Sequence, residues 1–147
     1  MKTAIAVLGM WALCGFAGAQ EVVRPLQAWT PPGWKSIQQD TGDLDRDGVD
    51  DVVIVLEQDD PANIKANDGL VSPQLNTSPR ALLVLFADHG GYRKVVENRT
   101  LVPTEGSSEE PCLDDPLAEV AIGNGTLKLV FERSLSCGGW ATSKVAY

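Results

Sequence analysis

Alternation between apolar and polar positions divides most of the chain into short segments that are typical of β-strands. Two runs are almost continuously apolar: 49–56 (VDDVVIVL), which is also β-branched and predicts a strand buried on both faces, and 80–88 (RALLVLFAD), which predicts a second buried strand. No helical period of useful length follows residue 19, so we expect no long helix. Weaker or alternating segments predict further strands at 34–39, 92–97, 117–122, 126–132 and 140–147.

Turn-forming residues join these segments into hairpins. The glycine-rich turns HGG (89–91) and GNG (123–125) each separate two of the predicted strands. Two polar stretches, 58–79 and 103–116, read as long loops, which in compact domains are usually functional or mobile. The sequence therefore predicts an all-β fold, a small antiparallel sandwich or curled sheet of about six to seven strands.

The first nineteen residues carry the features of a secretory signal. Lys2 supplies the positive start, and the apolar run 4–16 (AIAVLGMWALCGF) is too short to span a bilayer comfortably. The segment AGA (17–19) then offers small residues at a cleavage site. We expect cleavage between Ala19 and Gln20, with a buried N-terminal helix or a lipid-anchored cysteine as the alternatives.

The cysteines agree with export. Cys112 and Cys137 are the two that remain after signal removal, and in an oxidising compartment they are expected to form a disulfide, with two free thiols as the alternative. Closing a loop of about 25 residues would stabilise the fold by roughly 3 kcal/mol. We expect a bacterial protein of the periplasm or the medium, with residues 20–147 forming a single β domain.

Charge excludes two classes of partner. The chain has a formal net charge of −8, and such a surface repels phosphate backbones and anionic lipid. After residue 19 no apolar stretch is long enough to span a membrane. We therefore expect neither nucleic-acid binding nor membrane insertion after signal removal, and a protein or glycan of the cell envelope as the partner.

The stretch GDLDRDGVDD (42–51) crowds five aspartates around one glycine and suits a hard divalent cation. Ca²⁺ takes six to eight oxygen ligands, and Gly48 permits the sharp bend that lets the carboxylates converge. Mg²⁺ fits less well because it requires strict octahedral geometry. The expected ligands are the aspartates at loop positions one, three, five and nine and the carbonyl at position seven: Asp43, Asp45, Asp47, Asp51 and Val49.

The segment GDLDRDGVDDVVIVLE (42–57) resembles the calcium loop and following strand of FG-GAP repeats, the integrin-α-like or VCBS type. The resemblance implies Ca²⁺ binding by the same four aspartates and by the Val49 carbonyl. The motif occurs once, and a single blade cannot form a propeller, since such repeats bury their core by stacking on neighbours. More broadly, the chain resembles small exported bacterial proteins of unknown role.

The loop also differs from a helical Ca²⁺ sensor. An EF-hand places a bidentate glutamate at position twelve, where this chain has Ile54 in a predicted strand. That difference predicts a modest affinity, with a dissociation constant on the order of 10⁻⁴ to 10⁻³ M. Three alternatives stay open: an ion that only holds the loop, an ion that also presents a partner surface, or no ion at physiological concentration.

Residues suited to catalysis are few, and we expect no enzyme. The single histidine, His89, falls in a hairpin turn and reads as an exposed turn residue. Trp29, Trp34 and Trp140 either line a groove for sugar or peptide or pack in the core. The expected function is a calcium-binding interaction module, with a purely structural envelope protein or a glycan hydrolase as alternatives. The hydrolase would use acidic loop residues: Glu109, Glu110, Asp114 and Asp115.

Overall fold

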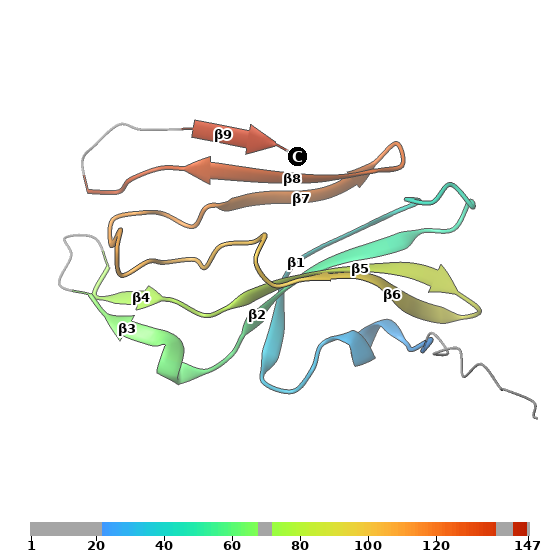
Figure 1. The fold of residues 1–147 in the computed structure, drawn as a ribbon, viewed down its shortest axis with the longest axis horizontal. Helices are drawn as coiled ribbons and strands as arrows, with labels where there is room; N and C mark the ends of the chain where they lie inside the picture. The colour runs from blue at the N-terminus through green and yellow to red at the C-terminus, as the bar shows by residue number, and fades with distance from the viewer. Residues whose placement is uncertain (1–21, 68–71, 138–142, 147) are drawn as a thin grey trace, which may run out of the picture.

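The structure is a computed structural model that describes residues 22–67, 72–137 and 143–146 of the chain. It is all-β, and its two main antiparallel sheets pack face to face as a sandwich (Figure 1). The first sheet has the order β1-β2-β5-β6 and the second the order β7-β8-β9. Their strands are β1 (Trp34–Gly42), β2 (Asp51–Gln58), β5 (Arg80–Asp88), β6 (Gly91–Asn98), β7 (Leu117–Gly123), β8 (Thr126–Arg133) and β9 (Ser143–Ala146).

Hairpin connections account for both sheets. In the first sheet Val53 of β2 lies opposite Val84 of β5, and Val84 lies opposite Val96 of β6. The turns after β5 and β7 place His89 and Asn124 at positive φ, as tight turns between strands require. The predicted all-β antiparallel fold is confirmed, and the seven strands of the two sheets match the segments read from the pattern.

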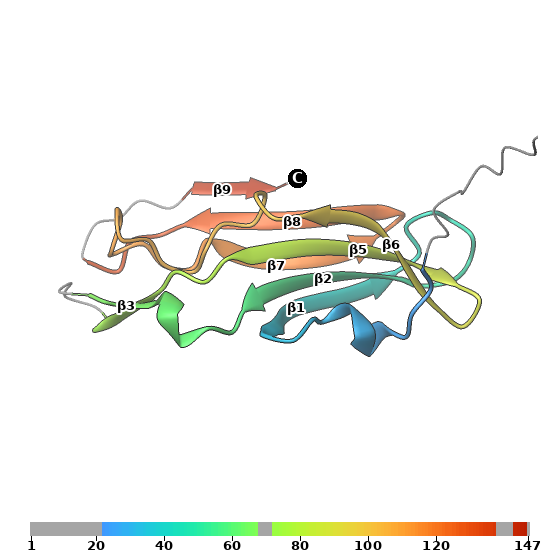
Figure 2. The ribbon, with the colours of Figure 1, turned by 60° about the horizontal axis from the view of Figure 1, so that its bottom comes forward.

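The two central strands are buried on both faces, as the nearly continuous apolar sequence of β2 predicts. Between the sheets, Val53 and Val84 pack with Leu129 of β8 in a core cluster. On the other face, Ile54 and Leu83 belong to a second cluster, which is covered by the N-terminal segment before β1. Figure 2 shows this segment crossing the outer face of the first sheet, so the molecule has three layers.

The long polar loops contain more structure than their composition predicts. Residues 58–79 include a 3₁₀ turn, η2 (Pro61–Asn63), and a two-stranded ribbon of β3 (Ile64–Ala66) and β4 (Gln74–Asn76). The chain therefore has nine strands in its described part, more than the six to seven expected. The alternation of apolar and polar residues does not predict this ribbon, because each strand has only three residues and β3 is exposed throughout.

Other boundaries also differ from the expectation. The proline-rich lead-in contains a 3₁₀ turn, η1 (Leu26–Trp29), and β1 continues three residues beyond the predicted end. The strand expected to begin at Val49 begins at Asp51, because the aspartate loop still occupies the two preceding positions. None of the described helices is both long and apolar enough to cross a membrane. The expected cleavage site at Ala19 and Gln20, and Trp140, lie outside the described residues.

Candidate metal site

The aspartate loop joins β1 to β2 and lies at the same end of the sandwich as the β7–β8 turn (Figure 1). Gly48 has a φ of +88° and Arg46 a φ of +66°, so the loop contains two left-handed turns of the backbone. The Arg46 side chain lies over Gly125, where an added Cβ would come within 2.9 Å of its Nε atom. The loop therefore rests on the second sheet through that glycine.

The base of the loop is anchored to the second sheet by an additional contact. The Asp40 carboxylate in β1 accepts a hydrogen bond of 2.7 Å from the backbone N–H of Ile122 in β7. Close by, a Cβ at Gly42 would meet the Ile122 side chain at 2.7 Å, so only glycine permits this approach. The last residues before the loop are thus fixed in position.

Asp51 is the buried member of the loop. Asp51 is the first residue of β2 and is only 1% exposed. Both of its carboxylate oxygens accept hydrogen bonds from backbone N–H groups. The N–H of Leu44 donates to Oδ2 at 2.9 Å, and the N–H of Ala87 donates to Oδ1 at 3.0 Å. Asp51 therefore joins the start of the loop to β5 and holds a negative charge at a fixed point.

Asp43 and Asp45 bring their carboxylates to the same place. One oxygen from each of Asp43, Asp45 and Asp51 lies within 4.8 Å of the other two. Ca²⁺–oxygen distances of about 2.3 to 2.6 Å put two ligands on opposite sides of one ion about 4.6 to 5.2 Å apart. The three oxygens therefore fit inside a single Ca²⁺ coordination sphere.

Backbone donors fix these carboxylates without saturating them. The Asp47 N–H donates to Asp43 Oδ1 at 3.1 Å and to Asp45 Oδ1 at 3.2 Å, while the Gly48 N–H donates to Asp43 Oδ2 at 3.0 Å. A carboxylate has about four lone-pair sites, so each group can accept these bonds and still coordinate a cation. Gly48, whose backbone is left-handed, is thus one of the donors that hold the Asp43 carboxylate.

Among the described residues, no ion pair neutralises this concentration of charge. Within the described ranges, no lysine or arginine forms an ion pair with Asp43, Asp45 or Asp51. Partial desolvation in the loop raises the pKa of Asp45, and the Asp47, Asp51 and Asp43 carboxylates raise it further. The hydrogen bond from the Asp47 N–H opposes this rise. A divalent cation would remove the repulsion at its source.

The other predicted ligands lie beside this group and not in it. Asp47 Oδ1 accepts a hydrogen bond of 2.8 Å from the Val49 N–H, and the Asp47 carboxylate does not join the three that converge. The ligand roles of Asp47 and of the Val49 carbonyl stay predictions. Asp50, which falls between the predicted ligand positions, is exposed.

A second polar cluster, formed by Glu57, Arg80 and Asp115 at the other end of β2, is not predicted from the sequence. Arg80 of β5 is 3% exposed and donates from Nε to Glu57 Oε2 at 2.9 Å and, in a bidentate pair, to Asp115 at 2.7 and 2.8 Å. Lys35 and Asn76 also contact the Glu57 carboxylate. Strand periodicity gives no signal for it, because Glu57 and Arg80 lie at the ends of two apolar runs that are distant in the sequence.

This cluster keeps Glu57 ionised. Burial would raise the pKa of Glu57, but hydrogen bonds from Asn76, Arg80 and Lys35 outweigh it and hold the pKa below its usual range. Arg80 in turn stays charged, because Asp115 and Glu57 oppose the effect of its burial and raise its pKa. The network joins both central strands to the loop 103–116, which makes it a structural tie.

Three of the four acidic loop residues considered for glycan hydrolysis are engaged in structural contacts, whereas Glu109 is exposed and its carboxylate makes no hydrogen bond or ion pair with the described residues. Both Asp115 oxygens pair with Arg80, and Glu110 pairs with Arg133. Hydrogen bonds from Ser134 and then Ser136 lower the pKa of Asp114, and the bond from Arg133 lowers the pKa of Glu110. A glycosidase acid needs a raised pKa, so these groups are poorly suited to that role.

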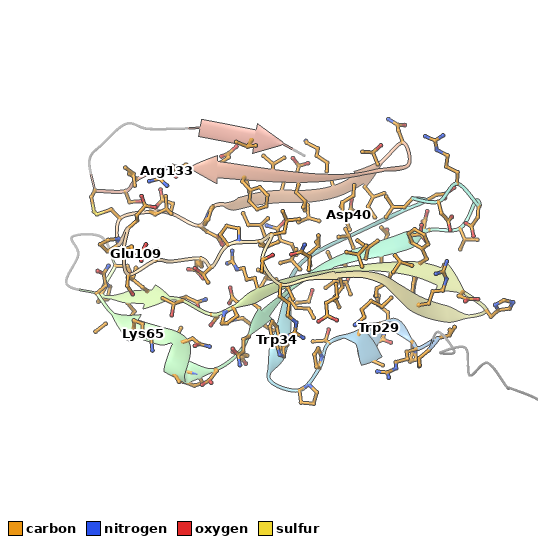
Figure 3. The ribbon with its side chains drawn as sticks, viewed as in Figure 1. Trp29, Trp34, Asp40, Lys65, Glu109 and Arg133 are labelled. Atoms are coloured by element: carbon orange, nitrogen blue, oxygen red, sulfur yellow. A yellow bond between two sulfur atoms is a disulfide. The ribbon has the colours of Figure 1, made fainter. Side chains whose placement is uncertain are left out.

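The remaining predicted residues are also placed. Cys112 and Cys137 form a disulfide with Cα atoms 5.5 Å apart, which joins the loop 103–116 to the segment after β8. His89 is an exposed turn residue with its side chain 94% exposed. Trp29 of η1 and Trp34 at the start of β1 pack against the outer core cluster, in the lower part of the molecule in Figure 3.

Comparisons with protein-family models, with curated proteins and with solved structures found no match. The function is therefore inferred from the geometry of the site alone.

Proposed function

We propose that this protein is an exported, non-catalytic β domain whose aspartate loop binds Ca²⁺ and that serves as an interaction module. The observation that carries the proposal is the convergence of Asp43, Asp45 and Asp51 within 4.8 Å, with no ion pair from a lysine or arginine among the described residues. All ligands are oxygens, which is the preference of a hard cation. Asp47 and the Val49 carbonyl are proposed to complete the coordination sphere.

Ca²⁺ would stabilise a part of the fold that is otherwise electrostatically unfavourable. Through Asp51 the loop reaches β5, and through Arg46 it reaches the β7–β8 turn. The ion therefore joins both sheets at one end of the sandwich. At about 1 mM Ca²⁺ and a dissociation constant near 0.1 mM, binding adds roughly 1.4 kcal/mol to the free energy of unfolding.

Two features support export and a partner. A disulfide such as Cys112–Cys137 is typical of oxidising compartments. The two acidic loops, 58–79 and 103–116, are linked: the Gly106 N–H donates to the Asn76 carbonyl, and Asn76 donates to Glu105. We propose that they form one acidic surface for a basic partner in the envelope. Such capture should weaken steeply as salt is added.

The test of calcium binding is thermal unfolding of the purified protein in excess EDTA and in a Ca²⁺ titration. We expect the midpoint to rise with Ca²⁺ in the parent and not in Asp45→Asn. The matched control is Asp59→Asn, which removes an exposed aspartate outside the loop and should keep the full response. A flat response in the parent would contradict the proposal, as would an equal response in both variants.

A further inference from the structure

A cavity of about 230 Å³ lies between the N-terminal segment and the outer face of the first sheet. Trp29 of η1 and Trp34 at the start of β1 line it, and both are labelled in Figure 3. Leu56, Ala81 and Leu83 from the two central strands provide an apolar floor. The cavity shares no residue with the aspartate loop.

The charge around this cavity is opposite to that of the molecule as a whole. Arg24, Lys94 and Arg99 all line it, together with one acidic residue, Glu97, in a chain whose net charge is −8. Lys94 and Arg99 both pair with Glu97. Arg24 forms no ion pair with any residue that the structure describes, so the site has positive charge in excess.

The indole Nε1–H of Trp29 is inaccessible to solvent and finds no hydrogen-bond partner in the described structure. A ligand in the cavity does not reach this atom, so Arg24 is the group that would pair with an anion there.

The tryptophan faces argue against a stacked sugar. The Arg24 guanidinium lies over the Trp29 ring and the Arg99 guanidinium over the Trp34 ring, each with its carbon 5.4 Å from the centroid. These cations already use ring faces on which a sugar would stack. What the cavity offers is an apolar floor, hydrogen-bond donors and positive charge.

We propose that this cavity binds a small organic anion, with an apolar body of one ring or a short branched chain that carries a carboxylate. The body would contact Leu56 and Leu83, and the carboxylate would pair with Arg24. The size is consistent, because a cavity of about 150 Å³ holds benzene, which leaves room here for one polar substituent.

The experiment is isothermal titration of the purified protein with phenylacetate, benzyl alcohol and phenethylamine, which share a ring and differ in charge. We expect saturable binding of phenylacetate, about tenfold tighter than of benzyl alcohol, because charge-assisted hydrogen bonds are the stronger ones. Arg24→Gln should weaken phenylacetate about tenfold and remove its preference over the alcohol. Lys128→Gln, which removes a cation from β8 outside the cavity, should change neither.

A second variant separates binding from folding. Ala28 is exposed and lines the cavity, so Ala28→Trp should fill it and abolish phenylacetate binding with the unfolding midpoint unchanged. Binding should be the same in EDTA and in Ca²⁺, which keeps this result distinct from that of the aspartate loop. The proposal is overturned if phenylacetate does not saturate, if the alcohol or the amine binds as tightly, or if N-acetylglucosamine binds in its place.

Discussion

The two ends of β2 carry buried acids in opposite electrostatic conditions. Glu57, near one end, is 2% exposed and has Lys35 and Arg80 within salt-bridge distance. Asp51, at the other end, is 1% exposed and has two backbone N–H donors and two neighbouring carboxylates. The Glu57 carboxylate pairs with cations inside the fold, whereas in the described structure no lysine or arginine pairs with the three carboxylates of the aspartate loop.

The difference indicates where a cation must come from. A buried carboxylate is retained when hydrogen bonds and opposite charge offset its desolvation, which Glu57 obtains inside the fold. Asp51 obtains the hydrogen bonds without the charge, while Asp43 and Asp45 add repulsion. At one end of β2 the buried carboxylate is paired with positive charge from the protein, and at the other end it is not. We propose that Ca²⁺ from solution supplies the positive charge at the aspartate loop.

The largest expected effect comes from breaking the network of Arg80, Glu57 and Asp115. Arg80→Met leaves Glu57 buried with only a half-exposed lysine as a cationic partner, and it releases Asp115. We expect a loss of about 3 to 5 kcal/mol in the free energy of unfolding, measured by urea denaturation, and an equal loss in Ca²⁺ and in EDTA. Arg99→Met, which removes an exposed ion pair, should cost less than about 1 kcal/mol. Equal losses in the two variants would contradict the contrast.

The disulfide stabilises the end of the molecule that contains the Arg80–Glu57 network. It holds the loop 103–116, which brings Asp115 to Arg80, and it closes a sequence separation of 25 residues. Replacing Cys112 and Cys137 together by serine should cost about 3 kcal/mol in urea denaturation. The Ca²⁺-dependent rise in midpoint should persist in this variant. Loss of that rise would mean that the two ends are not independent.

Acidification should weaken the stabilising contacts of Glu57 in a defined pH range. Since the folded-state pKa of Glu57 lies below its ordinary value of 4.5, its stabilising effect is complete above that pH. The effect is lost as pH falls through the lowered pKa. The stability difference between the parent and Glu57→Gln, followed by urea denaturation from pH 7 to 3, should therefore narrow below pH 4.5. A difference that is constant over this range would show that ionisation of Glu57 contributes nothing.

The smallest effect is a reversal at the aspartate end. Because the pKa of Asp45 is raised above its ordinary 3.8, ionisation of Asp45 disfavours the folded state at neutral pH when no ion is bound. In EDTA at pH 7, Asp45→Asn should therefore unfold at or slightly above the parent midpoint. In Ca²⁺ the order should reverse, since the variant lacks a ligand. The same order in both buffers would contradict a role for Asp45 in binding.

Much of the architecture follows from the sequence. The runs that become β2 and β5 predict buried strands, and the glycine turns predict the hairpins around them. The β3–β4 ribbon does not follow, because it depends on backbone pairing between two exposed three-residue segments. Its position is set by tertiary contacts, such as the bond between Gly106 and Asn76.

The candidate site is predictable in part. The spacing of the aspartates identifies the loop, and three of the four proposed carboxylate ligands converge. The sequence does not reveal that the Asp51 carboxylate is buried and bonded to the backbone of β5, since Ala87 is 36 positions away. Nor does it reveal the pairing of Arg80 with Glu57, because charged residues in apolar strands give no signal of their partners.

The most direct test is isothermal titration of chelator-treated protein with Ca²⁺, using the parent, Asp45→Asn and the Asp59→Asn control. We predict one ion per chain in the parent and the control, with a dissociation constant of about 10⁻⁴ to 10⁻³ M, and no measurable binding in Asp45→Asn. Absence of a saturable heat in the parent would contradict the proposal that the unpaired carboxylates form a calcium site. So would unchanged binding in Asp45→Asn.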